Sequence, residues 1–284
     1  ESLGKVDTEA SGDKNSLYVD EKENVYMSYY TTKKQVQVKT FHNGSFSSVG
    51  QVISNHEISS FIEFNGDFYL ASRNATNYGV DIYKLNQDKW ELYASYSCDY
   101  TENLSFIKTE NQLYLAYNST TTLFLVDVVS NKEITTKDFT YLTSPKMEYW
   151  NKKIYLVCSD YFATNSKGKL FSYDLENNIW KEEQESTLDK TNMHDIKVYK
   201  DSLYVLYGGN NSNPTLVECK ENTCSLKATL PIKNYINLSL HVGDDIYISY
   251  TSSEDSKTYI LKEEEKGFVL YNDNLGLGIT NLNI

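Results

Sequence analysis

The sequence predicts an all-β protein in which one structural unit is repeated six times, and three observations support this. First, an apolar-Tyr-apolar triplet occurs six times, centred on Tyr26, Tyr69, Tyr114, Tyr155, Tyr204 and Tyr247. Second, successive tyrosines of this set are 43, 45, 41, 49 and 43 residues apart, a near-constant period typical of repeat architectures. Third, each period contains four strand-length apolar segments separated by turn residues. Four short strands in a repeat of about 44 residues predict a six-bladed β-propeller with antiparallel blades.

The domain organisation follows from the same period. We expect a single domain over residues 1–284, because the repeats continue from Ser16 to Asn274 and no stretch has the composition of a flexible linker. The predicted blades cover about 16–54, 58–98, 103–139, 144–186, 193–231 and 237–274. In each blade the tyrosine triplet forms the second strand. Both faces of a blade pack on neighbouring blades, so we expect the six tyrosines in the core, and we expect the termini to assist ring closure.

Loop lengths indicate where function lies. The links between the first and second strands and between the third and fourth strands are tight, as in Asn65-Gly66-Asp67 and Asn86-Gln87-Asp88. The links between the second and third strands are longer and differ among blades, at 73–78, 160–167, 208–214 and 252–256. Strand alternation places these longer links at the same end as the links between blades. Variable loops on a rigid scaffold usually carry function, so this end is the predicted binding surface.

The longer-loop end is rich in aromatic side chains beside acids and amides. The predicted binding residues are Tyr78, Tyr100, Asp160, Tyr161, Phe162, Asp189 and Tyr235. Neighbouring polar residues are Asn77, Asp99, Asn165 and Asn234. Aromatic faces beside carboxylate or amide groups suit either sugar stacking or a protein-binding hot spot. Any one of these rings could instead cap the end of a blade, and the sequence leaves both interpretations open.

Charge and hydropathy restrict the classes of partner. The net charge is -12 and no cluster of lysines is long enough to follow a phosphate backbone, so we expect no nucleic-acid partner. No apolar run approaches the roughly 18 to 20 residues that span a bilayer, so we expect no membrane insertion.

The four cysteines suggest a disulfide and no metal site. Cys219 and Cys224 flank the predicted turn between the third and fourth strands of the fifth repeat, and facing residues of a hairpin are close enough to be bridged. This expected disulfide indicates an oxidising compartment, and we therefore expect a secreted or cell-surface protein. Cys98 and Cys158 lie in different repeats and are expected as buried thiols, although their pairing stays open. The cysteine spacing matches no metal-binding pattern, so no metal and no other cofactor is predicted.

Two repeats carry a further motif, in which an aromatic strand is followed by a turn and a tryptophan. Tyr173-Asp174 precedes Trp180, Tyr83 precedes Trp90, and the fifth repeat contains Gly208-Gly209. These features resemble the kelch repeat in a degenerate form, because the tryptophan is missing from the matching position of blades one, three, five and six. The sequence is also similar to degenerate propeller repeats on surface proteins of low-GC Gram-positive bacteria. Either resemblance implies a binding scaffold.

The expected function is therefore a non-catalytic recognition module that binds a protein or a glycan, for example in adhesion. A rival interpretation is a glycan-active enzyme with acids on the central axis, drawn from Asp99, Asp160, Asp189 and Asp195. A third is a structural spacer domain. His56, His194 and Asp195 could share a metal only if the fold brought them together, which their spacing does not require.

Overall fold

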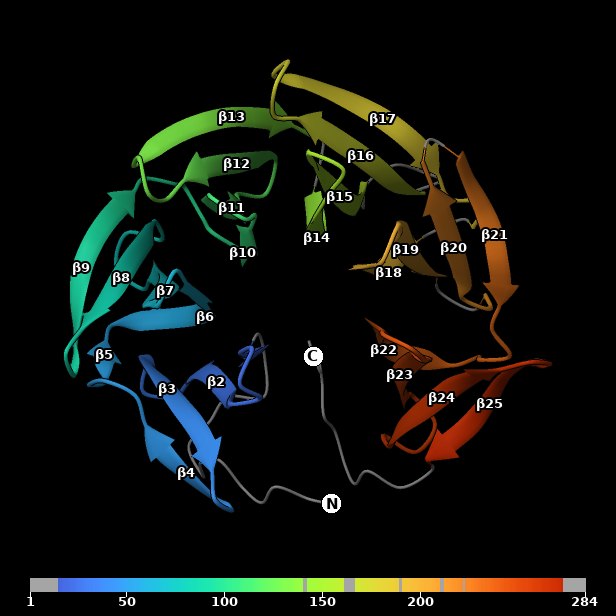
Figure 1. The fold of residues 1–284 in the computed structure, drawn as a ribbon, viewed down its shortest axis with the longest axis horizontal. Helices are drawn as coiled ribbons and strands as arrows, with labels where there is room; N and C mark the ends of the chain where they lie inside the picture. The colour runs from blue at the N-terminus through green and yellow to red at the C-terminus, as the bar shows by residue number, and fades with distance from the viewer. Residues whose placement is uncertain are drawn as a thin grey trace. The chain divides into compact units, whose positions relative to one another are not determined.

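The computed structural model describes residues 15–139, 142–160, 167–188, 191–209, 212–221 and 223–272. These residues form twenty-five β-strands and no helix. The strands assemble into six antiparallel sheets, each built from strands that are consecutive in the chain (Figure 1). The predicted fold class, a six-bladed β-propeller with four-stranded blades, is thereby confirmed. None of the described residues belongs to a helix that is long and apolar enough to cross a membrane.

The first compact unit ends at Lys137 and contains three sheets. The first sheet comprises β1 (Ser16–Val19), β2 (Val25–Tyr30), β3 (Gln35–His42) and β4 (Ser45–Ser48), and the short β5 (Ile53–Ser54) pairs with β3. The second comprises β6 (His56–Phe64), β7 (Asp67–Asn74), β8 (Val80–Asn86) and β9 (Lys89–Tyr96). The third comprises β10 (Asn103–Lys108), β11 (Leu113–Asn118), β12 (Thr122–Asp127) and β13 (Lys132–Asp138).

The second compact unit begins at Asp138 and contains the other three sheets. The fourth sheet comprises β14 (Leu142–Trp150), β15 (Lys153–Asp160), β16 (Gly168–Asp174) and β17 (Ile179–Glu185). The fifth comprises β18 (Thr191–Tyr199), β19 (Ser202–Gly209), β20 (Thr215–Lys220) and β21 (Thr223–Thr229). The sixth comprises β22 (Tyr235–Val242), β23 (Ile246–Ser252), β24 (Thr258–Glu264) and β25 (Gly267–Asn272).

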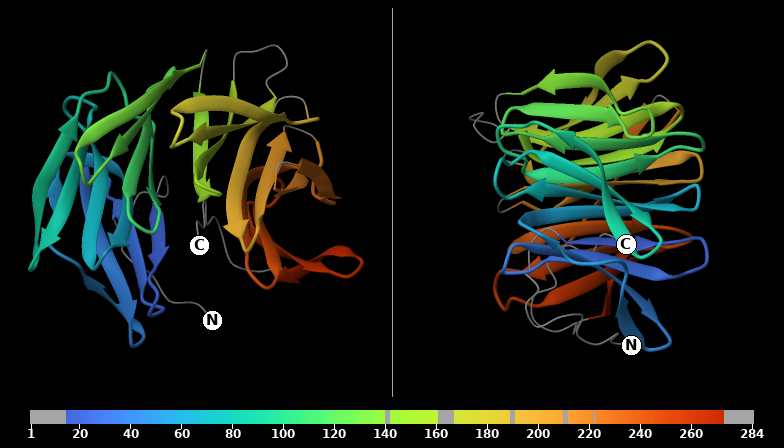
Figure 2. Two further views of the ribbon diagram at one scale, coloured as in Figure 1. Left: turned by 45° about the horizontal axis from the view of Figure 1, so that its top comes forward. Right: turned by 90° about the vertical axis from the view of Figure 1, so that its left-hand side faces the viewer.

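Asparagine and glycine set the tight turns. Asn65 and Gly66 between β6 and β7 both have positive φ, at 54° and 82°, as a two-residue type I′ hairpin requires. Asn43 and Gly44 between β3 and β4 do the same, at 49° and 80°. At the opposite end of the second sheet, five residues (75–79) join β7 to β8. The predicted contrast between tight and longer connections holds in the second, fourth, fifth and sixth sheets. In the first and third sheets it does not, because residues 20–24 and 109–112 join the first two strands while only 31–34 and 119–121 join the second and third. Figure 2 shows how successive strands of a sheet are joined.

The repeated tyrosines occupy the second strand of each sheet. Tyr69, Tyr114, Tyr155 and Tyr204 are buried, with 3% to 9% of each residue exposed. Tyr26 and Tyr247 are only half-buried, so the expectation that all six are core residues is wrong for these two. Their hydroxyls reach aspartates at the turn that precedes each strand, Asp20 at 3.5 Å and Asp245 at 3.2 Å. The polar end of each ring therefore stays near solvent while its apolar edge packs inward.

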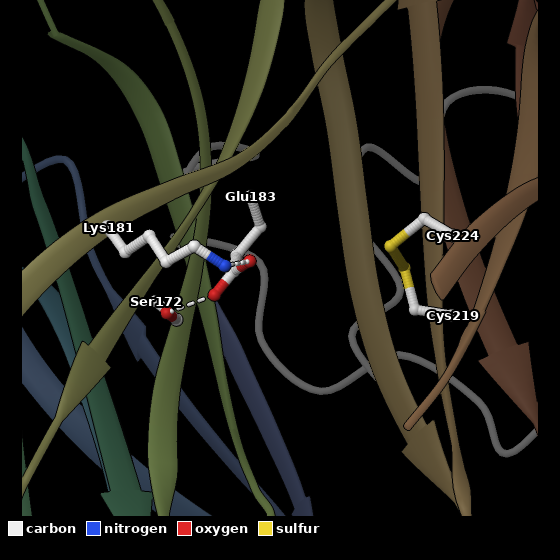
Figure 3. The surroundings of a disulfide bond; sticks show 5 residues. All are labelled: Ser172, Lys181, Glu183, Cys219 and Cys224. Carbon is white, nitrogen blue, oxygen red and sulfur yellow. Dashed lines mark hydrogen bonds and ion pairs between the residues drawn. A yellow bond between two sulfur atoms is a disulfide. The ribbon is translucent and has the colours of Figure 1, made fainter. Parts of the chain in front are cut away.

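The fifth sheet contains the expected disulfide. Cys219 on β20 and Cys224 on β21 face each other in the strand register, with Cα atoms 3.9 Å apart, and the structure joins them (Figure 3). The fourth sheet lies beside them in the same view, where Ser172 and Lys181 both bind Glu183, at 2.7 Å and 2.5 Å. Cys158 is buried and Cys98 is half-buried.

Candidate functional site

Two of the predicted binding residues, Tyr78 and Tyr100, lie side by side in the first unit. Tyr78 belongs to the loop between β7 and β8, and Tyr100 to the link between β9 and β10. Their ring centroids are 5.4 Å apart with an angle of 48° between the planes. Each residue is 42% exposed. The two rings, which we call the aromatic pair, therefore form a continuous aromatic surface that faces solvent.

The loop that carries Tyr78 is held by its own backbone and amide groups. The Asn74 side chain accepts a hydrogen bond from the Thr76 amide at 2.9 Å, and the Asn77 side chain accepts one from the Gly79 amide at 3.0 Å. The Tyr78 amide donates to the Asn74 carbonyl at 2.9 Å, and the backbone of Tyr78 has a φ of 61°. Left-handed backbone is uncommon for an aromatic residue, and such conformations persist where surrounding contacts over-determine them.

Gly79 fixes how closely this loop approaches the outer strand. A Cβ atom at this position would lie 2.5 Å from the carbonyl oxygen of Tyr96 on β9, which is too close for any other residue without a backbone shift. The Thr101 amide also donates to the Tyr78 carbonyl at 3.2 Å. The two segments that carry the aromatic pair are therefore joined directly, and the relative position of the rings is set before any ligand arrives.

Arg73, the sole arginine of the sequence, packs against the Tyr100 ring of the aromatic pair. Its guanidinium carbon lies 4.8 Å from the centroid of the Tyr100 ring, within cation–π range. Its Nη1 donates to the Thr101 carbonyl at 2.7 Å, and its Nη2 donates to Glu57 at 2.6 Å. These hydrogen bonds join β6, β7 and the link to β10 through one planar group. Arg73 is only 8% exposed, so the surrounding residues hold it in this arrangement.

Glu57 completes the polar part of the site. It faces Arg73 in the register of β6 and β7, and Lys34 lies 3.2 Å from its other oxygen. Partial burial acts to raise the pKa of Glu57, but hydrogen bonds from Arg73 and Lys34 and their positive charges outweigh it, so the pKa is lowered. Glu57 is therefore ionised at neutral pH, and its two oxygens are engaged by Lys34 and Arg73.

Behind the Tyr78 loop, His56 and Asp81 form a buried pair. The Nε2 of His56 lies 2.9 Å from Asp81, and its Nδ1 lies 2.8 Å from the Ser54 carbonyl. The Tyr83 hydroxyl also lies 3.1 Å from Nε2, so three oxygen atoms surround the imidazole ring. Asp81 also accepts hydrogen bonds from Ser95 at 2.6 Å and Asn74 at 3.0 Å. Asp81 therefore anchors Asn74, which begins the loop of the aromatic pair.

Tyr235 does not join an exposed surface. The sequence placed Tyr235 among the predicted binding residues, but the residue is only 7% exposed and its hydroxyl contacts Gly209 and Ser212. Its hydroxyl accepts a hydrogen bond from the Gly209 amide at 2.9 Å and lies 3.1 Å from the Ser212 carbonyl. Gly208 makes this packing possible, because a Cβ there would lie 2.3 Å from the Leu238 side chain.

The remaining predicted residues divide into two groups. Asp160 ends β15, but its side chain lies outside the described part of the chain, as do Tyr161, Phe162, Asn165 and Asp189 altogether. Asn77, Asp99 and Asn234 are exposed. The aromatic pair is thus the part of the predicted surface that the structure brings together.

Asp195, a candidate acid of the enzyme interpretation, is buried and hydrogen-bonded between two strands. It is 3% exposed and accepts hydrogen bonds from the Leu240 amide at 2.8 Å, the Ser239 hydroxyl at 3.1 Å and the Ile196 amide at 2.9 Å. These contacts join β18 to β22, and they occupy the carboxylate oxygens. Among the described residues, no three His, Cys, Asp or Glu side chains gather in a way that could hold a metal ion.

Arg73 and Glu57 were not among the predicted binding residues. Their signal in the sequence was the placement of the sole arginine directly before a long loop, with an acid in the first strand of the same repeat. Pairing them required the register of β6 and β7, which includes an irregularity between Glu57 and Ser59. A one-residue error in that register would have placed the two side chains on opposite faces.

Comparisons with known proteins show the fold. No protein-family model matches the chain, and no curated protein matches its sequence. Among solved structures, a mutant of the Aleuria aurantia lectin in complex with Fucα1-6GlcNAc matches with a TM-score of 0.60 at 9% identity, over 95% of this chain and 97% of the lectin. A protein from Lactobacillus plantarum matches with a TM-score of 0.65 at 9% identity, over 92% of this chain and 84% of that one.

Proposed function

We propose that the chain is a non-catalytic glycan-recognition module of a secreted or cell-surface protein, and that it binds sugar through the aromatic pair. The observation that carries this proposal is the contact between Tyr78 and Tyr100, two rings that are each 42% exposed although they touch each other. Large aromatic side chains are normally buried when they can be, so a paired and exposed arrangement indicates a contact surface.

The chemistry of the pair suits a sugar. The apolar C–H face of a pyranose stacks on an aromatic ring, and its hydroxyls need charged or amide partners at the rim. The buried Arg73 guanidinium contacts both Tyr100 and Glu57, so it positions the exposed ring and the carboxylate relative to each other. The hydrogen bonds within the Tyr78 loop hold these groups in place, which reduces the entropy lost on binding.

Two further observations support the proposal. The similar lectin was solved with a fucosylated disaccharide, so this fold accommodates glycan recognition in at least one protein, although the likeness at 9% identity concerns the fold alone. The disulfide between Cys219 and Cys224 is compatible with an oxidising compartment and hence with secretion or surface display. We further propose that the repeats are kelch-like and similar to those of Gram-positive surface proteins, which agrees with a binding scaffold.

The proposal is tested on a glycan array with three proteins: the intact chain, a Tyr78→Ala/Tyr100→Ala double variant and a Tyr271→Ala control. Tyr271 on β25 is 61% exposed, so the control removes an exposed tyrosine from the other unit. We expect the intact chain and the control to bind the same glycans, and the double variant to lose at least tenfold in affinity, since truncating an aromatic residue at the centre of a binding surface typically costs more than about 1 kcal/mol and a tenfold loss is about 1.4 kcal/mol. Unchanged binding by the double variant would exclude the aromatic pair. A pull-down from cell extract that captures a protein only with intact rings would assign the same surface to protein recognition.

A further inference from the structure

The sequence contains two Asn-Gly pairs, and each forms the tight turn of a hairpin. Asn43 and Gly44 join β3 to β4, and Asn65 and Gly66 join β6 to β7. The φ values of the two asparagines, 49° and 54°, and of the two glycines, 80° and 82°, are nearly the same. All four residues are exposed, and neither asparagine side chain makes a hydrogen bond within the described part of the chain. The two turns therefore differ little in backbone shape or exposure.

An Asn-Gly pair undergoes a reaction that needs only water. The backbone nitrogen of the glycine gives up its proton and attacks the side-chain carbonyl carbon, Cγ, of the asparagine. A C–N bond to the backbone forms and the bond to the side-chain nitrogen breaks, so ammonia leaves with a proton in place of the one that the glycine nitrogen lost. Water then opens the resulting succinimide ring at either carbonyl, which gives aspartate or isoaspartate. Glycine favours the attack because it has no side chain to obstruct it.

The two turns differ at the attacking nitrogen. The Gly66 amide donates a hydrogen bond to Oε1 of Glu63 at 2.8 Å. The Gly44 amide makes no hydrogen bond with any residue that the structure describes. Two positions before Asn43, where the second turn has its glutamate, the first turn has Phe41. The ring of Phe41 packs on Phe46 across the hairpin, with centroids 5.0 Å apart, and offers no acceptor.

The contact with Glu63 opposes the first step of the reaction. The attack requires a nitrogen that has lost its proton, and a carboxylate that accepts the N–H hydrogen bond favours the protonated form. The negative charge of the carboxylate also disfavours the negative charge that develops on the nitrogen. Neither effect acts on the Gly44 nitrogen, so the first turn should react faster than the second.

Other asparagines at hairpin turns lack the combination that Asn43 has. Asn131 and Asn178 also have positive φ, at 52° and 57°, but each is followed by a residue with a side chain. Their side-chain carbonyls accept hydrogen bonds from Tyr96 at 2.6 Å and from Tyr173 at 3.0 Å. Each of these asparagines must therefore break a hydrogen bond to a tyrosine before its carbonyl carbon can be attacked.

We propose that Asn43 is a site of spontaneous deamidation in the folded protein, and that Glu63 protects Asn65 from the same reaction. Either product adds a negative charge at the turn, and isoaspartate also moves its Cβ atom into the main chain. A two-residue turn depends on the backbone of both its residues, so this extra atom disturbs the pairing that follows. Because β4 has only four residues and pairs with β3 alone, we expect modification to loosen this hairpin first. Neither turn belongs to the aromatic pair, so the inference goes beyond the proposed function.

The test is peptide mapping by mass spectrometry of the full chain after incubation at 37 °C at pH 7 and at pH 9. We expect aspartate and isoaspartate to accumulate about tenfold faster at Asn43 than at Asn65, which corresponds to about 1.4 kcal/mol in activation free energy. Both rates should rise with pH, because the attacking nitrogen must lose a proton. In urea, where the hydrogen bond to Glu63 is lost, the two asparagines should react at similar rates.

Variants assign the difference to the glutamate. Glu63→Ala should raise the rate at Asn65 about tenfold and leave the rate at Asn43 unchanged, which serves as the internal reference. Glu63→Gln keeps an acceptor but removes the charge, so it should give a smaller rise. Glu265→Ala removes an exposed glutamate from a turn of the sixth sheet and should change neither rate. Circular dichroism melts show whether each variant is folded, and Glu63→Gln decides if Glu63→Ala is not.

Three outcomes would overturn the proposal: equal rates at the two turns of the folded chain, a faster reaction at Asn65, or a rate at Asn65 that the folded Glu63 variants leave unchanged. Equal rates would mean that the shared backbone shape of the turns controls the reaction. A faster reaction at Asn65 would mean that Glu63 assists the attack by accepting the proton. None of these outcomes bears on glycan binding by Tyr78 and Tyr100, which the glycan array tests separately.

Discussion

The guanidinium group of Arg73 stacks on the ring of Tyr100 with 4.8 Å between guanidinium carbon and ring centroid, and it bonds Glu57 and the Thr101 carbonyl at the same time. One side chain thus connects an exposed aromatic surface to a partly buried acid and to the backbone of the link that leads to the next blade. This arrangement depends on the planar, multiply donating geometry that arginine has and lysine lacks.

Arg73→Lys should therefore weaken both stability and ligand binding. The lysine can keep a charge near Glu57 but cannot also reach the Thr101 carbonyl and stack on Tyr100, so we expect a loss of about 2 kcal/mol in the free energy of unfolding. Urea denaturation measures this loss. Lys84→Arg, at the 35% exposed ion pair with Asp67, is the matched control and should change stability by less than about 0.5 kcal/mol. Equal stability of Arg73→Lys and the wild type would contradict the structural role of this side chain.

Acid should destabilise the first unit through Asp81. Burial acts to raise the pKa of Asp81, but hydrogen bonds from His56, Ser95 and Asn74 and the charge of His56 lower it below its ordinary value. A carboxyl whose pKa is lower in the folded state stabilises the fold above its unfolded pKa of about 4 and loses that contribution as the pH falls through the folded value. Denaturation at pH 6 and pH 3 should therefore show a larger loss for the wild type than for Asp81→Asn. Parallel losses in both proteins would argue against this pair.

Tyr207 and Tyr235 should respond differently to removal of the hydroxyl. Tyr207 is 0% exposed, its hydroxyl has no hydrogen-bond partner among the described residues, and burial raises its pKa strongly. Tyr207→Phe should be neutral or stabilising by up to about 1 kcal/mol, because it removes a buried hydroxyl without breaking a hydrogen bond. Tyr235→Phe should cost about 1–2 kcal/mol, since it leaves Gly209 without its partner. Thermal denaturation of the two variants, each the control of the other, checks this order.

The disulfide should contribute a moderate amount of stability. Cys219 and Cys224 are only five residues apart, and the chain-entropy model assigns about 2 kcal/mol to so short a loop. The double variant Cys219→Ser/Cys224→Ser should therefore unfold at a lower temperature than the wild type under oxidising conditions. With a reducing agent present the two proteins should melt together, and a persistent difference would assign the effect to packing of the serines.

The fold was predictable because its signals are local. The Asn-Gly turns and the Cys219–Cys224 spacing each act within one hairpin, where a few residues determine the geometry. The tyrosine period repeats along the whole chain and is visible without any knowledge of strand pairing. Tyr235 was misjudged because its burial depends on a loop 26 residues away in the chain. The Arg73–Glu57–Tyr100 contact required both strand register and packing between neighbouring blades, which no single segment encodes.

The most direct test of the proposed function is the dissociation constant of the best array glycan for the intact chain, for the Tyr78→Ala/Tyr100→Ala variant and for the Tyr271→Ala control. The aromatic-pair model predicts that the double variant binds at least tenfold more weakly, because both rings contact the ligand. Its melting temperature should stay near that of the wild type, because both rings are substantially exposed. An unchanged dissociation constant in the double variant would contradict the model, as would an intact chain that binds no glycan at all.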